Sequence, residues 1–118
     1  MERIRIHGVL TAAGMAALAV LAVPAAAQDA AKDTYLRYHQ AISVVEKCDE
    51  RVFNQNEYSS MEAYIDKQIN NQLGAGERLH LIEQGKTNAY DLVTKWGCDS
   101  DKVGEYLQLF ERELMLVI

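Results

Sequence analysis

The sequence predicts an all-α fold, a small up-down helical bundle of about four helices that is stapled by one disulfide. Beyond residue 27, apolar residues recur three or four positions apart, which is the period of an amphipathic helix. The only proline, Pro24, precedes this part of the chain, so no proline interrupts a helix there. Short polar or glycine-containing segments separate the apolar stretches, and short connections favour antiparallel neighbours.

The N-terminal segment, residues 1–27, has the features of a cleaved signal peptide. Arg3 and Arg5 precede an uncharged apolar stretch of 16 residues, and a run of three alanines follows. This pattern predicts cleavage between Ala27 and Gln28. The apolar stretch is shorter than the roughly 20 residues that span a bilayer, so we do not expect a permanent membrane anchor.

The segment after cleavage, residues 28–118, is expected to form a single small helical domain in the periplasm or outside the cell. The alanine-rich signal peptide favours a bacterial envelope. The segment carries 10 lysines and arginines against 16 aspartates and glutamates, a formal charge of −6. Because an acidic surface repels anions, neither nucleic acid nor an anionic membrane is an expected partner.

The two cysteines, Cys48 and Cys98, are expected to form a disulfide, as a cysteine pair in a small exported domain most simply does. The bond would close a loop with 49 residues between its ends. A redox-active pair or an intermolecular bridge is the alternative. The chain has no C-x-x-C motif, which argues against the redox alternative.

The first helix is expected over about 31–51, and Asn54-Gln55-Asn56 is expected to be a loop. The apolar stripe of this helix is formed by residues three or four apart, namely Tyr38, Ala41, Ile42, Val45, Cys48 and Val52.

The second helix is expected over about 60–73. Ser59 and Glu62 have the spacing of a capping box, and Gly74 is placed to end the helix in the left-handed conformation. Its stripe repeats every four residues, at Met61, Ile65, Ile69 and Leu73.

The third helix is expected over about 77–96, with Gly97 as its C-terminal cap. Gly85 inside it costs about 1 kcal/mol relative to alanine, which points to a close approach or a kink. The stripe of this helix consists of Leu79, Ile82, Ala89, Val93 and Trp96.

The fourth helix is expected to begin after Asp99-Ser100-Asp101, which supplies an N-cap and negative charge at the positive end of the helix. Its end, from Leu114 to Ile118, is apolar all round, so it is either buried or exposed for a partner. The stripe consists of Val103, Tyr106, Leu107, Phe110, Leu114 and Val117.

No pattern in the sequence predicts catalysis, a metal site or a cofactor. His80 and Glu83 could share a helix face, and His39 could join them, but zinc sites use three or four protein ligands. The chain contains no G-x-S-x-G and no glycine-rich phosphate loop that follows a strand. We therefore expect a protein that binds rather than an enzyme.

The expected function is protein–protein interaction, with a partner of unknown identity and with homo-oligomers as an open alternative. Tyrosine is enriched at interfaces, and the apolar C-terminus is a second candidate surface. The candidate interface residues are Tyr35, Tyr64, Met115, Val117 and Ile118. An inhibitor or immunity protein of an exported enzyme and a carrier of a small ligand or metal are alternatives.

The layout of Cys48 and Cys98 is similar to that of periplasmic acid-stress chaperones of the HdeA kind. Those proteins are also small, exported and helical, with one disulfide that spans about half the chain. The similarity lies in this layout alone. It implies a third alternative, in which acid protonates the carboxylates, loosens the bundle and exposes apolar stripes to client proteins.

Overall fold

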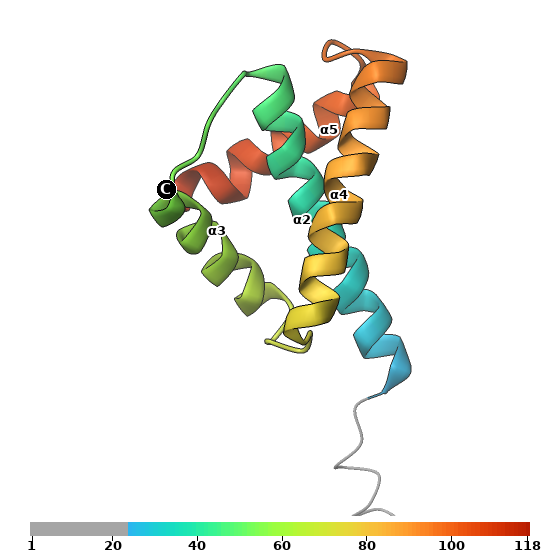
Figure 1. The fold of residues 1–118 in the computed structure, drawn as a ribbon, viewed down its shortest axis with the longest axis vertical. Coiled ribbons are helices and arrows are strands. Elements are labelled where there is room, and N and C mark those ends of the chain that lie inside the picture. The colour runs from blue at the N-terminus through green and yellow to red at the C-terminus, as the bar shows by residue number, and fades with distance from the viewer. Residues whose placement is uncertain (1–23) are drawn as a thin grey trace, which may run out of the picture.

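The computed structural model describes residues 24–118, which form four α-helices and no strand (Figure 1). The helices are α2 (Ala25–Cys48), α3 (Gln55–Gln68), α4 (Ala75–Trp96) and α5 (Asp101–Leu109). The chain then continues through a π-helical turn (Phe110–Leu114) and a 3-10 turn (Met115–Val117). The predicted all-α bundle with one disulfide is confirmed.

The two longest helices, α2 and α4, pack side by side and run in the same direction (Figure 1). The helix between them in the sequence, α3, returns in the opposite direction and stands off from the pair. Few of its Cα atoms come within 8 Å of α2. The chain therefore runs up and down as predicted, but the most closely packed pair is parallel.

Most of the predicted signal peptide lies outside the described residues. Within them, Pro24 precedes the first turn of α2, and the predicted cleavage point between Ala27 and Gln28 falls in that turn. Cleavage there stays a prediction. The helix begins about six residues earlier than expected and ends at Cys48 instead of residue 51.

The start of α3 was predicted at the wrong place. Asn54, expected in a loop, is the N-cap, and it forms a reciprocal capping box with Glu57. The predicted box of Ser59 and Glu62 does not form, because both residues lie within the helix and Glu62 contacts α2 instead. Both residue pairs have the same spacing, so spacing alone could not distinguish them.

The turn between α3 and α4 also differs from the prediction. α3 ends at Gln68, and Asn70 and Asn71 adopt positive φ values of 53° and 52°. Asparagine tolerates this conformation better than most residues do. Gly74 has a φ of −76° and is the N-cap of α4, so its predicted role as a left-handed cap is wrong.

The predicted caps of the last two helices agree with the structure. Gly97 follows α4 with a φ of 83°, and its backbone N–H donates to the Val93 carbonyl. Ser100 is the N-cap of α5, where its hydroxyl accepts from the Val103 backbone N–H.

The core forms where side chains from all four helices meet. The largest fully buried side chains include Tyr35 of α2, Met61 and Ile65 of α3, and Phe110 and Leu114 after α5. The predicted α3 stripe is buried throughout. Three predicted core residues are exposed instead, and these are Val52, Leu79 and Trp96.

The close contact between α2 and α4 depends on Gly85. A Cβ atom at this position would lie 3.2 Å from the Cβ of His39 and 3.4 Å from the backbone of α2. The expected close approach is therefore present. Leu81 and Ala89, one helical turn to either side of Gly85, are also buried, so the buried face of α4 shares only Ala89 with the predicted stripe.

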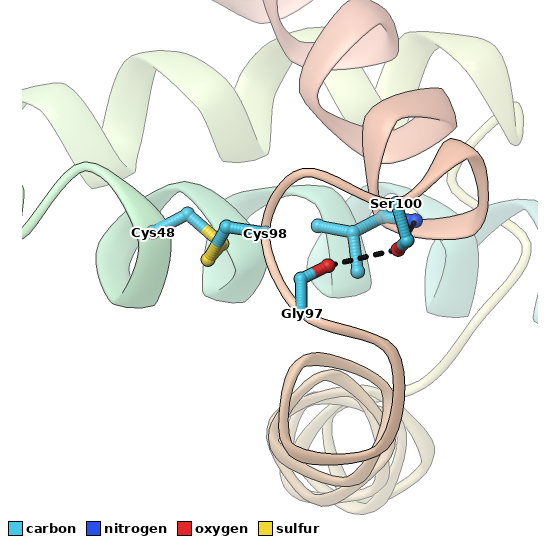
Figure 2. Close-up of a disulfide and its surroundings, with 5 residues drawn as sticks. Cys48, Gly97, Cys98 and Ser100 are labelled. Carbon is cyan, nitrogen blue, oxygen red and sulfur yellow. Dashed lines mark hydrogen bonds between the residues drawn. A yellow bond between two sulfur atoms is a disulfide. The ribbon is translucent and has the colours of Figure 1, made fainter.

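The disulfide joins the end of α2 to the loop that follows α4 (Figure 2). Cys48 and Cys98 have Cα atoms 5.7 Å apart. In the same loop the Ser100 hydroxyl donates to the Gly97 carbonyl at 2.8 Å. The covalent bond therefore connects the upper ends of the two parallel helices and the start of α5.

Candidate functional site

A groove of about 440 Å³ lies between α2, α3 and α4. It exists because α3 stands off from α2 while α4 packs tightly against it. Its apolar lining comes from Ile42 of α2 and from Leu79 and Ile82 of α4. Polar groups line the remainder of the groove, and they come from all three helices.

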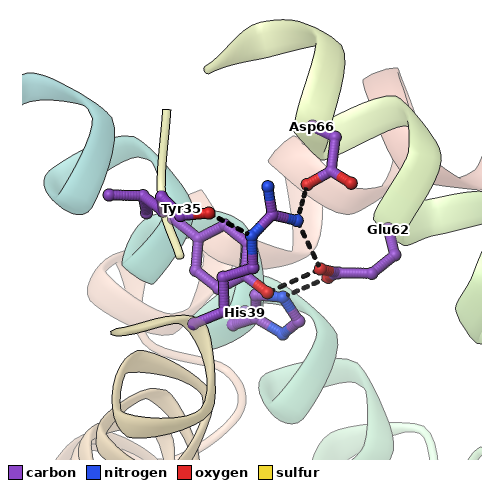
Figure 3. A network of polar contacts seen from close by, with 6 residues as sticks. Tyr35, His39, Glu62 and Asp66 are labelled. Atoms are coloured by element: carbon purple, nitrogen blue, oxygen red, sulfur yellow. Dashed lines mark hydrogen bonds and ion pairs between the residues drawn. The ribbon is translucent and has the colours of Figure 1, made fainter. Parts of the chain in front are cut away.

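The most connected polar group in the groove is the carboxylate of Glu62 (Figure 3). The Tyr35 hydroxyl donates to one of its oxygens at 2.5 Å, and Nε2 of His39 lies 2.7 Å from the other. Arg78 of α4 lies 3.7 Å from the first oxygen and also pairs with Asp66. One carboxylate of α3 is thereby connected to both long helices.

The hydrogen bonds of Glu62 lower its own pKa and raise the pKa of Tyr35. Burial by itself would raise the pKa of Glu62, but the hydrogen bonds from His39 and Tyr35 outweigh it, so the pKa lies below its ordinary value. Burial and the hydrogen bond to Glu62 raise the pKa of the Tyr35 phenol. Glu62 is therefore ionised and Tyr35 neutral over a wide range around neutrality.

Arg78 is also bonded to the end of the preceding turn. Its Nε donates to the Leu73 carbonyl at 2.8 Å, while its guanidinium reaches Asp66 and Glu62. The same guanidinium lies 5.7 Å from the centre of the Tyr35 ring. Such a fixed network is preorganised, because little side-chain entropy remains to be lost when a partner binds.

A second carboxylate contact lies further along the groove. The Tyr58 hydroxyl of α3 donates to Glu46 of α2, and burial together with this hydrogen bond raises the pKa of Tyr58 to about 12. Tyr58 also packs edge-on against Phe53, with ring centres 5.7 Å apart. The groove is therefore bounded by two separate contacts between α2 and α3.

A third contact of this kind lies outside the groove, where the chain ends. Glu113 accepts from the hydroxyls of Tyr38 at 2.6 Å and Tyr64 at 2.7 Å. Burial would raise the pKa of Glu113, but these hydrogen bonds outweigh it and lower the pKa. The C-terminal turn is thus attached to α2 and α3 by one carboxylate.

The predicted interface residues lie in two parts of the molecule, with Tyr35 in the lining of the groove and the other four at or beside the C-terminal turn. Tyr35 has no exposed area, so an exposed surface cannot include its side chain in this conformation. Tyr64, Val117 and Ile118 are half-buried against the core, whereas Met115 is 43% exposed. An interface role for these residues stays a prediction, and of the five only Tyr35 lines the groove.

The sequence does not predict that His39, Glu62 and Arg78 give the groove its chemistry, and it points to His39 only as a possible metal ligand beside His80 and Glu83. The signal that could have found His39 is its position four residues after Tyr35, on the apolar side of the first helix. Glu62 was assigned to a cap, and Arg78 lay outside the predicted stripe. Their convergence depends on how α3 and α4 pack against α2.

Within residues 24–118, no group of three or more His, Cys, Asp or Glu side chains is placed to hold a metal ion. His80, considered above as a ligand, is exposed on α4. None of the described helices combines the length and the apolar character that crossing a bilayer requires. Comparison with protein-family models, curated proteins and solved structures finds no match for this chain.

Proposed function

We propose that this chain is an exported, non-catalytic binding protein, and that a protein partner inserts an apolar side chain into the groove between α2, α3 and α4. The observation that carries the proposal is a largely apolar groove of about 440 Å³ with a fixed charged network inside it. Apolar burial would supply affinity, and the oriented polar groups would supply specificity.

The open rim of the groove favours a protein over a small molecule as its occupant. Leu79 is 62% exposed and Tyr58 is 38% exposed at this rim. Sites for small molecules typically bury about 70–90% of the ligand surface. A protein partner would cover the rim as well as the groove, and would remove the exposed Leu79 side chain from water.

The test of this proposal is to fill the groove from a residue of α2. Ser43 is buried and lines the groove, so Ser43→Leu places an apolar side chain inside it. Ser60→Leu on exposed α3 surface outside the groove is the matched control. Each protein, as its mature form, is used to capture partners from its own envelope fraction, and captured proteins are quantified by mass spectrometry.

The expected result is one dominant partner whose capture falls about tenfold or more with Ser43→Leu, equivalent to about 1.4 kcal/mol, and is unchanged with Ser60→Leu. Equal capture by both variants would overturn the proposed use of the groove. Native mass spectrometry of the purified protein distinguishes the carrier alternative, because a bound small molecule that Ser43→Leu displaces would identify a ligand carrier instead.

A second candidate is an acid-stress chaperone, and one observation favours it. Glu62 and Glu113 attach α3 and the C-terminal turn through ionised carboxylates, and acid would remove those charges. Detachment would expose the buried side chains of Met61 and Ile65. Incubation with an acid-labile client at about pH 3, below ordinary carboxyl pKa values, tests this candidate. Unchanged client aggregation would rule it out.

A further inference from the structure

Beside the groove, α4 carries a stripe of four exposed side chains that does not contribute to the core. Leu79, Glu83, Lys86 and Tyr90 follow one another at intervals of four, three and four residues. At 3.6 residues per turn these positions lie on one face of a helix. Leu79 is 62% exposed and Tyr90 53% exposed, and the side chains of Glu83 and Lys86 are 65% and 59% exposed.

The stripe can pair with the same stripe of a second copy that runs in the opposite direction. If a second α4 lies antiparallel with its Tyr90 opposite Leu79, then its Lys86 lies opposite Glu83. The two-fold axis passes between residues 84 and 85, and every contact occurs twice, as an isologous interface requires. Apolar side chains meet at the two ends of the stripe, and opposite charges meet in the middle.

The neighbouring positions on the same face allow this pairing. In the same register Gly76 lies opposite Val93, and Ala75 lies opposite Thr94. These residues are small or uncharged, so no like charges are brought together along α4. A Cβ at Gly76 would meet nothing within 4 Å, which shows that the surface at this end of the helix is free.

We propose that α4 is the contact surface of a symmetric homodimer, in which two copies of this chain pair through Leu79, Glu83, Lys86 and Tyr90. Charge complementarity selects a second copy as the partner. The sequence of charges along the face matches its own reverse, and an unrelated partner would not require that symmetry.

The isolated chain gives the central charges little stabilisation. Glu83 and Lys86 form an intrahelical pair at 3.7 Å, and such exposed pairs contribute roughly 0–1 kcal/mol. In the dimer four charges alternate around the axis and are partly removed from water, which strengthens their attraction. Each Leu79 would be covered by the Tyr90 ring of the second copy, which adds apolar burial at both ends.

The dimer is expected to be weak and to depend on concentration. A helix of 22 residues is about 33 Å long and about 10 Å wide, which covers less than the ~800 Å² per partner of a standard interface. We therefore expect a monomer–dimer equilibrium in the micromolar range or weaker, measured by sedimentation equilibrium over a wide range of concentrations.

Charge reversal on this face tests the proposed register. Glu83→Lys places two lysines opposite two lysines in the homodimer, and Lys86→Glu places two glutamates opposite two glutamates. Each variant alone is expected to weaken self-association about tenfold or more. An equimolar mixture of the two variants is expected to associate again, because one chain then presents only lysines and the other only glutamates. The double variant is expected to self-associate like the unaltered chain.

Glu105→Lys is the control, since Glu105 is exposed on α5 and its reversal changes net charge by the same amount. Circular dichroism of each variant verifies that the fold is retained. A chain that stays monomeric at all concentrations, or a dimer that Glu83→Lys and Glu105→Lys weaken equally, would overturn the proposal. The dimer would cover Leu79 and Lys86, which also line the groove, so the second copy and the proposed partner would exclude one another there. The two proposals still fail separately, because sedimentation equilibrium of the purified chain needs no partner, whereas the proposed function is measured by partner capture.

Discussion

The α2–α4 pair and α3 are held in the structure in different ways. The pair is in contact through Gly85, where a Cβ atom would lie tightly against α2, and is closed by the disulfide at its end. α3 stands further away and combines two fully buried apolar side chains, Met61 and Ile65, with polar contacts to the other elements. Those polar contacts all involve carboxyl groups.

This difference indicates which part of the molecule responds to a change of pH. Apolar packing and a covalent bond depend little on pH, whereas contacts made by carboxylates are lost when the carboxylates are protonated. The groove lies along the boundary between the two parts. The contacts between α2 and α3 that border the groove are therefore the ones that respond to acid.

Removal of the disulfide is expected to have the largest effect, and it acts on the α2–α4 pair. For the Cys48→Ser/Cys98→Ser double variant we expect a loss of about 4 kcal/mol in the free energy of unfolding, from the entropy of a loop of this length. Urea denaturation measures the change. A reducing agent should destabilise the unaltered chain by the same amount and leave the variant unaffected. If reduction has no effect, the bond contributes nothing to stability.

Filling the contact between α2 and α4 is expected to have the next largest effect. Gly85→Leu forces a side chain against His39 and the backbone of α2, and overpacking of this kind typically costs about 1–3 kcal/mol. Thermal unfolding measures the loss. An unchanged melting temperature would show that α4 can move away from α2 at no cost. The α2–α4 pair would then not be the more rigidly packed region.

Acid is expected to act first on α3. In the folded protein the pKa of Glu62 and of Glu113 lies below the ordinary value of 4.5. A lowered pKa contributes its stabilisation in full above the ordinary value, and this stabilisation is lost as the pH falls through the folded value. Amide hydrogen exchange should therefore show α3 losing protection below about pH 4.5 before α4 does.

Amide hydrogen exchange of a Glu62 variant tests whether Glu62 itself causes the pH dependence of α3. Glu62→Gln removes the charge but keeps the shape, and we expect a loss of roughly 1 kcal/mol at neutral pH, the usual value for a partly exposed hydrogen bond. The variant should also depend less on pH than the unaltered chain does. Simultaneous loss of protection in α3 and α4 at acidic pH would contradict the proposed difference between the two regions.

The smallest expected effect is a gain of stability from a substitution in α5, which belongs neither to the α2–α4 pair nor to α3. Gly104 lies inside α5, and a Cβ there would meet nothing within 4 Å. Gly104→Ala should therefore stabilise the fold by roughly 0.5–1 kcal/mol through helix propensity alone. Comparison of this result with Gly85→Ala separates backbone propensity from packing, since Gly85→Ala should gain less or lose stability.

The three- and four-residue period of apolar side chains predicted some of the buried residues correctly and others wrongly. The period of three and four residues correctly placed Met61 and Ile65 in the core, because burial of one helix face is required whatever lies opposite. The same period placed Val52 and Leu79 in the core, although both are exposed. Which part of an apolar stripe is buried depends on the angle at which the neighbouring helix approaches.

The sequence by itself determined the helical class, the order of the helices and the disulfide, because these depend on local periodicity, on capping residues and on there being only two cysteines. Only the tertiary structure decided that Glu62 contacts α2 instead of capping its own helix, and that the parallel pair of α2 and α4 leaves a groove beside α3. These features arise from contacts between residues far apart in the chain. Local spacing carries no information about such contacts until the helices are packed together.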